Sequence, residues 1–219
     1  MPRDWRRLVR RFRDILQEMS DAIDHEGLYR LAEEQAGYFT TQQAIDVGMD
    51  DSTLSHHARD GGRFERINTG LYRLRHFPTS QHEHVVAAWL PLRAGGGVVS
   101  HESALELYEL SDVIPRAVHI TLPRSKRGNR RRTGVQLHAL EQPPGPKEVR
   151  RIGPVVATTP ERSIVDALAS GSQPEQIELA IQQALDRGLT TPERLRRAAT
   201  ERSRRVREQL CQFLVGQGT

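Results

Sequence analysis

The chain has 219 residues, of which 37% are apolar, a formal net charge of +4 and an isoelectric point near 9.7. This length is enough for two domains that each bury a core of their own. The absence of any window of about 18 apolar residues excludes a membrane-spanning helix, and the single cysteine, Cys211, excludes an internal disulfide, so we expect a soluble, cytoplasmic protein.

The first 26 residues are predicted to form an amphipathic helix, because apolar side chains recur at helical spacing from Trp5 to Ile23, with arginines on the other side. It is either a cover over the following domain or a helix for dimerisation or DNA contact. Asp4, Asp14 and Glu18 disfavour a mitochondrial presequence.

A second helix is expected to begin near Gly27 or Leu28, with Leu28, Leu31 and Ala32 on one face. Tyr38 and Phe39 then form a small strand. These elements open a domain that we assign to residues 27–78.

Two short helices follow, separated by a glycine turn. Thr40 or Thr41 is a natural N-cap for a helix that reaches Val47 and stops at Gly48. Asp50 or Asp51 caps the next helix, which Gly61 and Gly62 terminate. This arrangement is typical of a helix-turn-helix.

The second of these helices has one apolar side and one polar side. Leu54 and Ala58 must face the core. The opposite side carries short polar and basic side chains, which are suited to base edges and phosphates in the major groove: Ser52, His56, Arg59 and Arg63.

The segment from Arg63 to Arg75 alternates like two strands around a Thr69-Gly70 turn, which predicts a hairpin, the wing of a winged helix-turn-helix. A two-residue turn places Arg66 opposite Arg73, and Ile67 opposite Tyr72. Opposed arginines favour an anion such as a DNA phosphate between them. The alternative is a structural helix-turn-helix that binds no nucleic acid.

The pattern changes after Pro78. Residues 81–92 predict a helix that Pro91 and the glycines at 95–97 end, followed by a short strand at 98–99 and a helix capped by Ser100. Residues 117–122 alternate like a strand, and 134–140 like its returning partner.

The residues between these strands, RSKRGNRRR at 124–132, carry six positive charges, so removing them from the net +4 leaves −2. This concentration is typical of a polyanion-binding footprint, here expected at the tip of a hairpin. The alternative is a solvated charged loop.

The C-terminal third alternates a strand with helices that begin at proline. Thr159 and Pro160 open a helix in which Arg162 and Asp166, four residues apart, can pair for a few tenths of a kcal/mol. Further helices are expected over residues 174–186 and from Thr191-Pro192 through Arg207.

GLYRL at 70–74, VVSHESALELYELSD at 98–112, ITLPRSKR at 120–127 and TTPERSIVDAL at 158–168, in this order, resemble the AbiEi-type antitoxins of type IV toxin–antitoxin (abortive infection) systems. The resemblance implies an α+β protein, with a winged helix-turn-helix followed by a mixed α/β antitoxin domain over residues 79–219. It also implies an autorepressor that binds inverted repeats in operator DNA, as a homodimer or as paired monomers, and counteracts a nucleotidyltransferase-like toxin. The alternative is a module that neutralises a toxin by direct contact.

The expected DNA contacts come from the second helix, the wing and the basic run. They are Ser52, Thr53, Ser55, His56, Arg59, Arg63, Arg66, Arg73, Arg124, Lys126, Arg127, Arg130, Arg131 and Arg132.

Catalysis is disfavoured. The two lysines, Lys126 and Lys147, lack the carboxylate spacing of a metal-dependent nuclease, and the glycines at 95–97 lack the lysine and hydroxyl of a phosphate-binding loop. Isolated candidates remain at His101, Glu102, Glu161 and Asp166, and His82-x-His84 offers a metal-binding pair. We expect no cofactor, no metal and no enzymatic activity.

Overall fold

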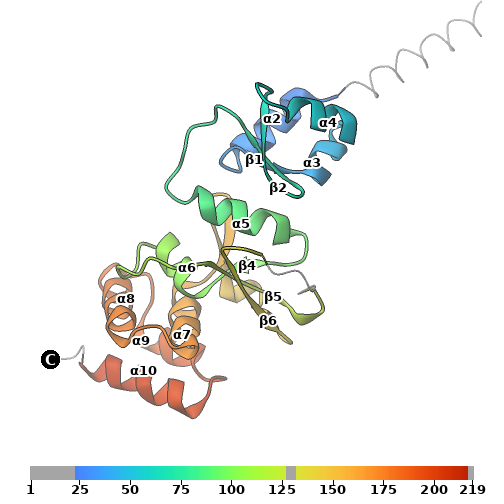
Figure 1. The fold of residues 1–219 in the computed structure, drawn as a ribbon. Helices are drawn as coiled ribbons and strands as arrows, with labels where there is room; N and C mark the ends of the chain where they lie inside the picture. The colour runs from blue at the N-terminus through green and yellow to red at the C-terminus, as the bar shows by residue number, and fades with distance from the viewer. Residues whose placement is uncertain (1–22, 127–131, 217–219) are drawn as a thin grey trace, which may run out of the picture. The chain divides into compact units, whose positions relative to one another are not determined.

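The computed structural model describes residues 23–126 and 132–216. The chain divides into two compact units, Met1–Thr79 and Ser80–Thr219, one residue from the predicted boundary. Both units mix helices with a sheet, as an α+β chain requires (Figure 1). The N-terminal helix expected over residues 1–26 falls almost wholly outside the described residues, so its role stays a prediction. No helix in the described ranges is long and apolar enough to cross a membrane.

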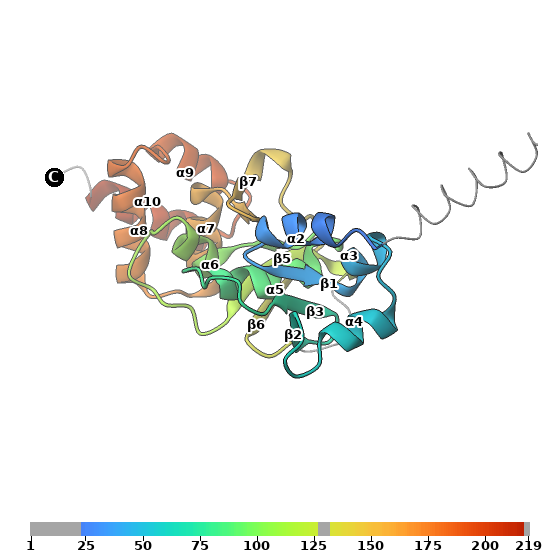
Figure 2. The same cartoon turned by 90° about the horizontal axis from the view of Figure 1, so that it is seen from above.

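From residue 23 onwards, unit 1 has three short helices and a three-stranded antiparallel sheet (Figure 2). Its elements are α2 (His25–Glu33), β1 (Tyr38–Thr40), α3 (Thr41–Asp46), α4 (Asp51–His57), β2 (Phe64–Asn68) and β3 (Leu71–Leu74), with sheet order β1-β3-β2. Helix α2 begins two residues before the expected Gly27, because the Asp24 carboxylate accepts a hydrogen bond from the Gly27 backbone N–H at 2.8 Å.

The core of unit 1 is built from one face of each helix and the inner face of the sheet. Leu28 and Ala32 of α2 and Leu54 of α4 are fully buried, as their helical spacing predicts. The rings of Phe39 and Phe64 meet edge to face, with centroids 4.9 Å apart. Each such side chain contributes about 1.5–3 kcal/mol through burial, so this small core fixes how the helices pack.

Unit 2 places helices around a five-stranded mixed sheet of order β6-β5-β4-β8-β7. Its elements are α5 (Glu83–Arg93), β4 (Val98–Val99), α6 (His101–Leu107), β5 (Val118–Pro123), η1 (Arg124–Lys126), β6 (Val135–Leu140), η2 (Pro146–Glu148), β7 (Val149–Ile152), β8 (Val155–Thr158), α7 (Pro160–Ser170), α8 (Pro174–Asp186), α9 (Pro192–Ala198) and α10 (Arg204–Gly216). Helix α7 packs against α6, α8, α9 and α10, and the core there includes Leu105, Ile164 and Leu195.

Helix α5 ends at Arg93, one residue beyond the expected Leu92, with Pro91 inside its last turn. One expected helix in unit 2 is wrong. The helix expected from Pro192 through Arg207 is two helices, since α9 stops at Ala198 and α10 starts at Arg204. The break lets Arg202 turn towards Asp166 of α7, a tertiary contact that overrides local helix propensity.

The expected hairpin between residues 117 and 140 is also wrong. Strands β5 and β6 pair in parallel, from Val118 opposite Val135 to Pro123 opposite Leu140. The chain must therefore cross back along the strand length, about 20 Å, between Pro123 and Val135. The described part of the basic run, η1 and residue 132, is therefore not the tip of a hairpin, and residues 127–131 lie outside the described residues.

Candidate functional site

The α3–α4 pair of unit 1 is held by caps and a tight turn. Thr40 and Gln43 form a reciprocal capping box at the start of α3. Gly48 has φ of +86°, a conformation that favours glycine, and its backbone N–H donates to the Ile45 carbonyl oxygen at 2.9 Å. Met49 is buried immediately after this turn, which anchors the entry to α4.

Helix α4 starts at the N-cap Asp50, whose side chain accepts hydrogen bonds from the Thr53 backbone N–H at 2.7 Å and from the Ser52 hydroxyl at 3.0 Å. The bond from Thr53 is the largest cause of a lowered pKa at Asp50, so this carboxyl group is ionised at the positive end of the helix. The Ser52 hydroxyl is thus partly used by the cap, which the sequence did not indicate.

The outward side of α4 and of the turn after it is polar and exposed. Ser52, Ser55, His56 and Arg59 are all exposed, whereas Thr53 is half-buried and Leu54 on the opposite side is buried. Arg59 lies two residues beyond the end of α4 at His57. Ser52, Ser55 and His56 are spaced three or four residues apart, so they share one face of the helix.

The hairpin expected over residues 63–75 is present as β2 and β3, but its expected register is wrong. Arg66 lies opposite Tyr72 and Glu65 opposite Arg73, and a β-bulge falls between Arg66 and Asn68. The two arginines are therefore not opposed. A bulge of one residue shifts every side chain beyond it to the other face of the strand, and the sequence alternation did not reveal it.

Arg73 is a structural residue rather than an exposed phosphate contact. It is 8% exposed, lies over the Tyr38 ring at 5.6 Å, and its guanidinium donates to the carbonyl oxygens of Phe77 at 2.9 Å and Pro78 at 3.3 Å. These contacts hold the chain that leaves the hairpin. We therefore remove Arg73 from the candidate interface.

Arg75 has a related structural role that the sequence did not suggest. Its guanidinium donates to the carbonyl oxygens of Gly62 at 2.6 Å, Phe64 at 3.1 Å and Arg59 at 3.2 Å. It thereby clamps the loop between α4 and β2. In contrast, the side chains of Arg59, Arg63 and Arg66 are exposed and make no hydrogen bond or ion pair within residues 23–126 and 132–216.

At least one positive charge of the basic run of unit 2 is already paired with a carboxylate of the chain. Arg124 pairs with Glu141 at 2.9 Å on the surface, and Lys126 and Arg132 are exposed. Arg127, Arg130 and Arg131 fall outside the described residues. The role of this run as a polyanion contact stays a prediction.

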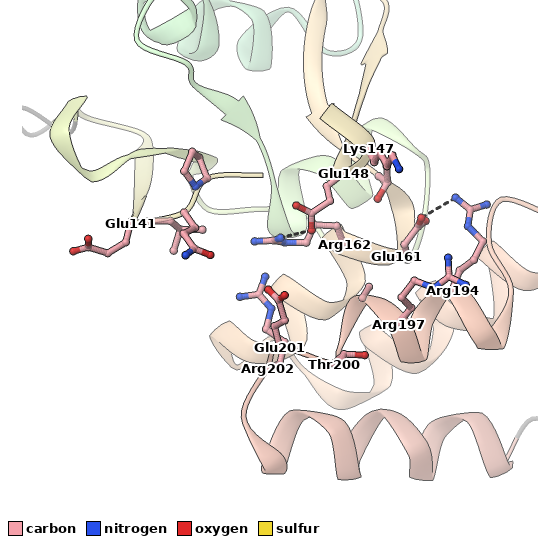
Figure 3. Close-up of a pocket in the computed structure, with 15 residues that line it drawn as sticks. Glu141, Lys147, Glu148, Glu161, Arg162, Arg194, Arg197, Thr200, Glu201 and Arg202 are labelled. Atoms are coloured by element: carbon pink, nitrogen blue, oxygen red, sulfur yellow. Dashed lines mark hydrogen bonds and ion pairs between the residues drawn. The ribbon is translucent and has the colours of Figure 1, made fainter. Parts of the chain in front are cut away.

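A cavity of about 850 Å³ in unit 2 is lined by carboxylates and arginines (Figure 3). Glu161 pairs with Arg194 at 2.7 Å, and Glu148 pairs with Arg162 at 2.5 Å. Asp166 is held by Arg162 at 2.8 Å and by Arg202, two arginines that line this cavity. Glu161 and Asp166, which were candidate catalytic carboxylates, are therefore engaged in ion pairs.

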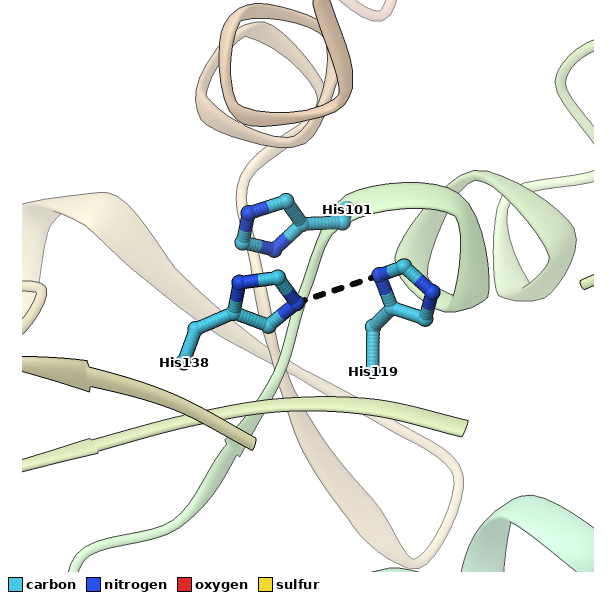
Figure 4. Close-up of side chains that lie close together, drawn as sticks. All are labelled: His101, His119 and His138. Carbon is cyan, nitrogen blue, oxygen red and sulfur yellow. Dashed lines mark hydrogen bonds between the residues drawn. The ribbon is translucent and has the colours of Figure 1, made fainter. Parts of the chain in front are cut away.

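The remaining candidates for catalysis or metal binding lie elsewhere in unit 2. Glu102 accepts a hydrogen bond from the Ser172 hydroxyl at 2.6 Å. His82 and His84 both approach Glu106, at 3.7 and 3.1 Å. His101 belongs to a group that sequence reasoning missed, in which it meets His119 and His138 (Figure 4).

These three histidines come from helix α6 and from the neighbouring strands β5 and β6. His138 Nε2 lies 3.2 Å from His119 Nδ1, and the rings of His101 and His138 stack with centroids 3.6 Å apart. The strand alternation of residues 117–122 and 134–140 fixes which face each histidine occupies. It could not show that the strands are parallel neighbours.

Comparison with known proteins defines the fold alone. No family model matches the chain, and no curated protein is similar to it in sequence. Its structure is similar to the crystal structure of the RV2827C protein from Mycobacterium tuberculosis, with a TM-score of 0.56 and 17% identity over 86% of this chain and 74% of that chain. This likeness supports the mixed α+β architecture.

Proposed function

We propose that unit 1 is a winged helix-turn-helix domain that binds double-stranded operator DNA. Helices α3 and α4 are its helix-turn-helix, with α4 as the recognition helix, and the β2–β3 hairpin is its wing. The order of elements, the Gly48 turn and the bulged hairpin support this assignment.

The observation that carries the proposal is the outward surface of α4. Leu54 packs its side of α4 into the core of unit 1. Ser55, His56 and Arg59 are exposed, and their side chains make no hydrogen bond or ion pair within the described ranges. Hydroxyl, imidazole and guanidinium groups are the donors and acceptors that read base edges in the major groove.

Arg63 and Arg66 supply the phosphate contacts in this proposal. Arg63 precedes β2, and Arg66 lies on β2, one of the two edge strands of the sheet, with its side chain exposed. Phosphate contacts position the domain on the duplex and make its affinity depend on salt. Arg73 is not part of this set because its guanidinium is committed to backbone carbonyl oxygens.

In the wider proposal the protein is a cytoplasmic, non-enzymatic autorepressor and antitoxin of a type IV toxin–antitoxin system. Unit 2 would counteract a nucleotidyltransferase-like toxin. This part rests on the resemblance of four ordered motifs, three of which lie in unit 2. The ion pairs of Glu161 and Asp166 support a structural role for these carboxylates.

A mobility-shift titration tests the proposal. The purified full chain is titrated onto the duplex immediately upstream of its own gene and onto a scrambled duplex, each at two salt concentrations. We expect preferential binding to the upstream duplex, with a log–log salt slope of about −0.9 per phosphate contact. Equal or absent binding to both duplexes would favour a module that contacts a toxin directly.

Two arginine variants make the test specific for the interface. Arg59→Ala should cost about 1–3 kcal/mol of operator binding and relax sequence preference, whereas Arg66→Ala should weaken both duplexes equally and flatten the salt slope by about one unit. Arg205→Ala is a charge-matched control, because Arg205 is exposed in α10 of unit 2. If the control loses as much affinity as Arg59→Ala, α4 is not the readout element.

A further inference from the structure

The histidine cluster of unit 2 is assembled by the sheet. His119 lies on β5 and His138 on β6, where His138 is opposite Thr121, two residues after His119. Because alternate residues of a strand share a face, both imidazoles lie on the same side of the sheet. His101 is the first residue of α6, directly after β4, the other neighbour of β5.

The separation of the ring nitrogens suits a metal ion. One nitrogen from each of the three histidines lies within 4.8 Å of the other two, and His119 Nδ1 is 3.2 Å from His138 Nε2. Two nitrogens bound to zinc at 2.0–2.1 Å with a tetrahedral angle are about 3.3–3.4 Å apart. We propose that His101, His119 and His138 form a binding site for a divalent transition-metal ion, with zinc as the physiological ion.

The protonation state of the cluster favours a cation. Burial, and then the neighbouring histidines, lower the pKa of His101 to about 2, and burial lowers that of His138 to about 4. Burial also lowers the pKa of His119, against the attraction of Glu102. Burial therefore disfavours the charged imidazolium at all three positions, and the uncharged imidazole is the form that binds a metal.

The surroundings of His101 resemble the outer shell of a metal site. His101 Nδ1 lies 2.8 Å from the Ser100 hydroxyl, which in turn lies 2.8 Å from the Thr121 hydroxyl. Such a chain orients the His101 imidazole, as outer-shell partners do for metal-bound histidines. The His101 ring is stacked on that of His138, so it must tilt out of the stack for both rings to direct a nitrogen at one ion.

An open coordination position faces a second cavity. This cavity, of about 640 Å³, is lined by His119 and His138 and also by Glu102, Asp112 and Arg116. Three protein ligands with an accessible fourth position hold water or an anionic oxygen on the metal. Imidazole ligands favour Zn²⁺, Cu²⁺, Ni²⁺ or Co²⁺ over Mg²⁺ and Ca²⁺.

The test is a metal titration of the full chain without an affinity tag, first stripped with a chelator. Co²⁺ should bind at one ion per chain with the visible absorption of a low-symmetry nitrogen site, and Zn²⁺ should abolish that absorption by displacement. Mg²⁺ should not compete. Failure of the wild-type chain to bind Co²⁺ and Zn²⁺ stoichiometrically would overturn the proposal.

Variants identify the ligands. His119→Gln and His138→Gln should each reduce Zn²⁺ affinity by more than the ten- to hundredfold loss typical of outer-shell changes, and Ser100→Ala by about tenfold. Circular dichroism verifies that each variant is folded. His101→Asn adds a third ligand test, because His101 has φ of +55° and asparagine tolerates that conformation.

His84→Gln is the matched control. It removes an exposed histidine of unit 2 that contacts Glu106 and lies outside the cluster. Unchanged Zn²⁺ affinity in this variant supports the proposed site. Loss of affinity in His84→Gln with retention in His138→Gln would place the metal at His82, His84 and Glu106 and refute the proposal.

Discussion

Replacing Asp166 with asparagine should lower the free energy of unfolding of unit 2 by about 3 kcal/mol. The Asp166 side chain is 4% exposed and accepts hydrogen bonds from Arg162 Nε at 2.8 Å and from Arg202. Asparagine keeps the shape of the side chain but removes its negative charge. The positive charges of Arg162 and Arg202 then lose a carboxylate partner.

The magnitude follows from what remains around each arginine. Removing one partner of a buried pair costs about 3–5 kcal/mol. Arg162 is only 11% exposed but keeps Glu148 at 2.5 Å, and Arg202 is partly solvated, so the lower end of that range applies. Burial opposes the ionisation of Asp166, and the charges of Arg162 and Arg202 counter that effect. The double variant Arg162→Met with Asp166→Leu removes both charges of the pair, so it should lose less stability than the sum of the single changes.

Urea unfolding measured by tryptophan fluorescence is a suitable assay. The chain has two tryptophans, Trp5 and Trp89, and Trp89 is buried in α5 of unit 2. In a Trp5→Phe background the signal therefore reports unit 2. A loss of 3 kcal/mol lowers the urea midpoint by about 1–3 M for ordinary values of the denaturant slope.

Glu208→Gln provides a control in which the same kind of pair is exposed. Arg204 and Glu208 of α10 are 84% and 57% exposed, and breaking this pair should change stability by less than about 0.5 kcal/mol. If Asp166→Asn is as mild as Glu208→Gln, the reasoning that burial makes the Asp166 network indispensable is wrong.

Three further outcomes are expected. Arg73→Met should lower the stability of unit 1 by about 1–3 kcal/mol, measured by faster hydrogen exchange over residues 64–77, because two carbonyl groups lose their donor. Gly62→Ala should weaken operator binding at least about tenfold in the mobility-shift assay, because its Cβ would lie 2.1 Å from the His57 carbonyl oxygen and displace the loop after α4. Burial would raise the pKa of Glu148, but a hydrogen bond from the Gly145 N–H and the attraction of arginines lower it overall. Its stabilising contribution is complete above the ordinary pKa and is lost as pH falls below about 5 through the lowered folded value, so Glu148→Gln should flatten the acid limb of stability against pH.

Local signals in the sequence predicted most elements of unit 1. Caps and glycines act within a few residues, so Thr40, Asp50 and Gly48 mark the helix ends at positions that the structure confirms. The face of α4 that carries Leu54 is equally local. The extra residue in β2 could not be predicted from local signals, because a bulge depends on how two strands align. The alternation of either strand alone is compatible with both registers.

The parts of unit 2 that could not be predicted depend on contacts distant in sequence. Strands β5 and β6 would show the same alternation in a hairpin and in a parallel pair. Only the parallel pairing brings His138 next to His119, and only the position of β4 beside β5 adds His101. In the same way, Arg162 and Asp166 are spaced for a weak surface pair, and the contact with Arg202 from beyond α9 is what makes them a buried network.

The arginines of this chain show why counting charges in a sequence overestimates how many of them can contact a partner. A guanidinium has five N–H donors, so an arginine placed near backbone carbonyls or buried carboxylates is consumed by the fold. Arg75 and Arg187 donate to carbonyl oxygens of neighbouring loops, and Arg162 is fixed by carboxylates. Arg59 and Arg66 differ in that their heads reach solvent without an intramolecular acceptor in the described ranges. The salt slope of operator binding should therefore follow the number of such uncommitted arginines in unit 1, rather than the arginine content of the chain.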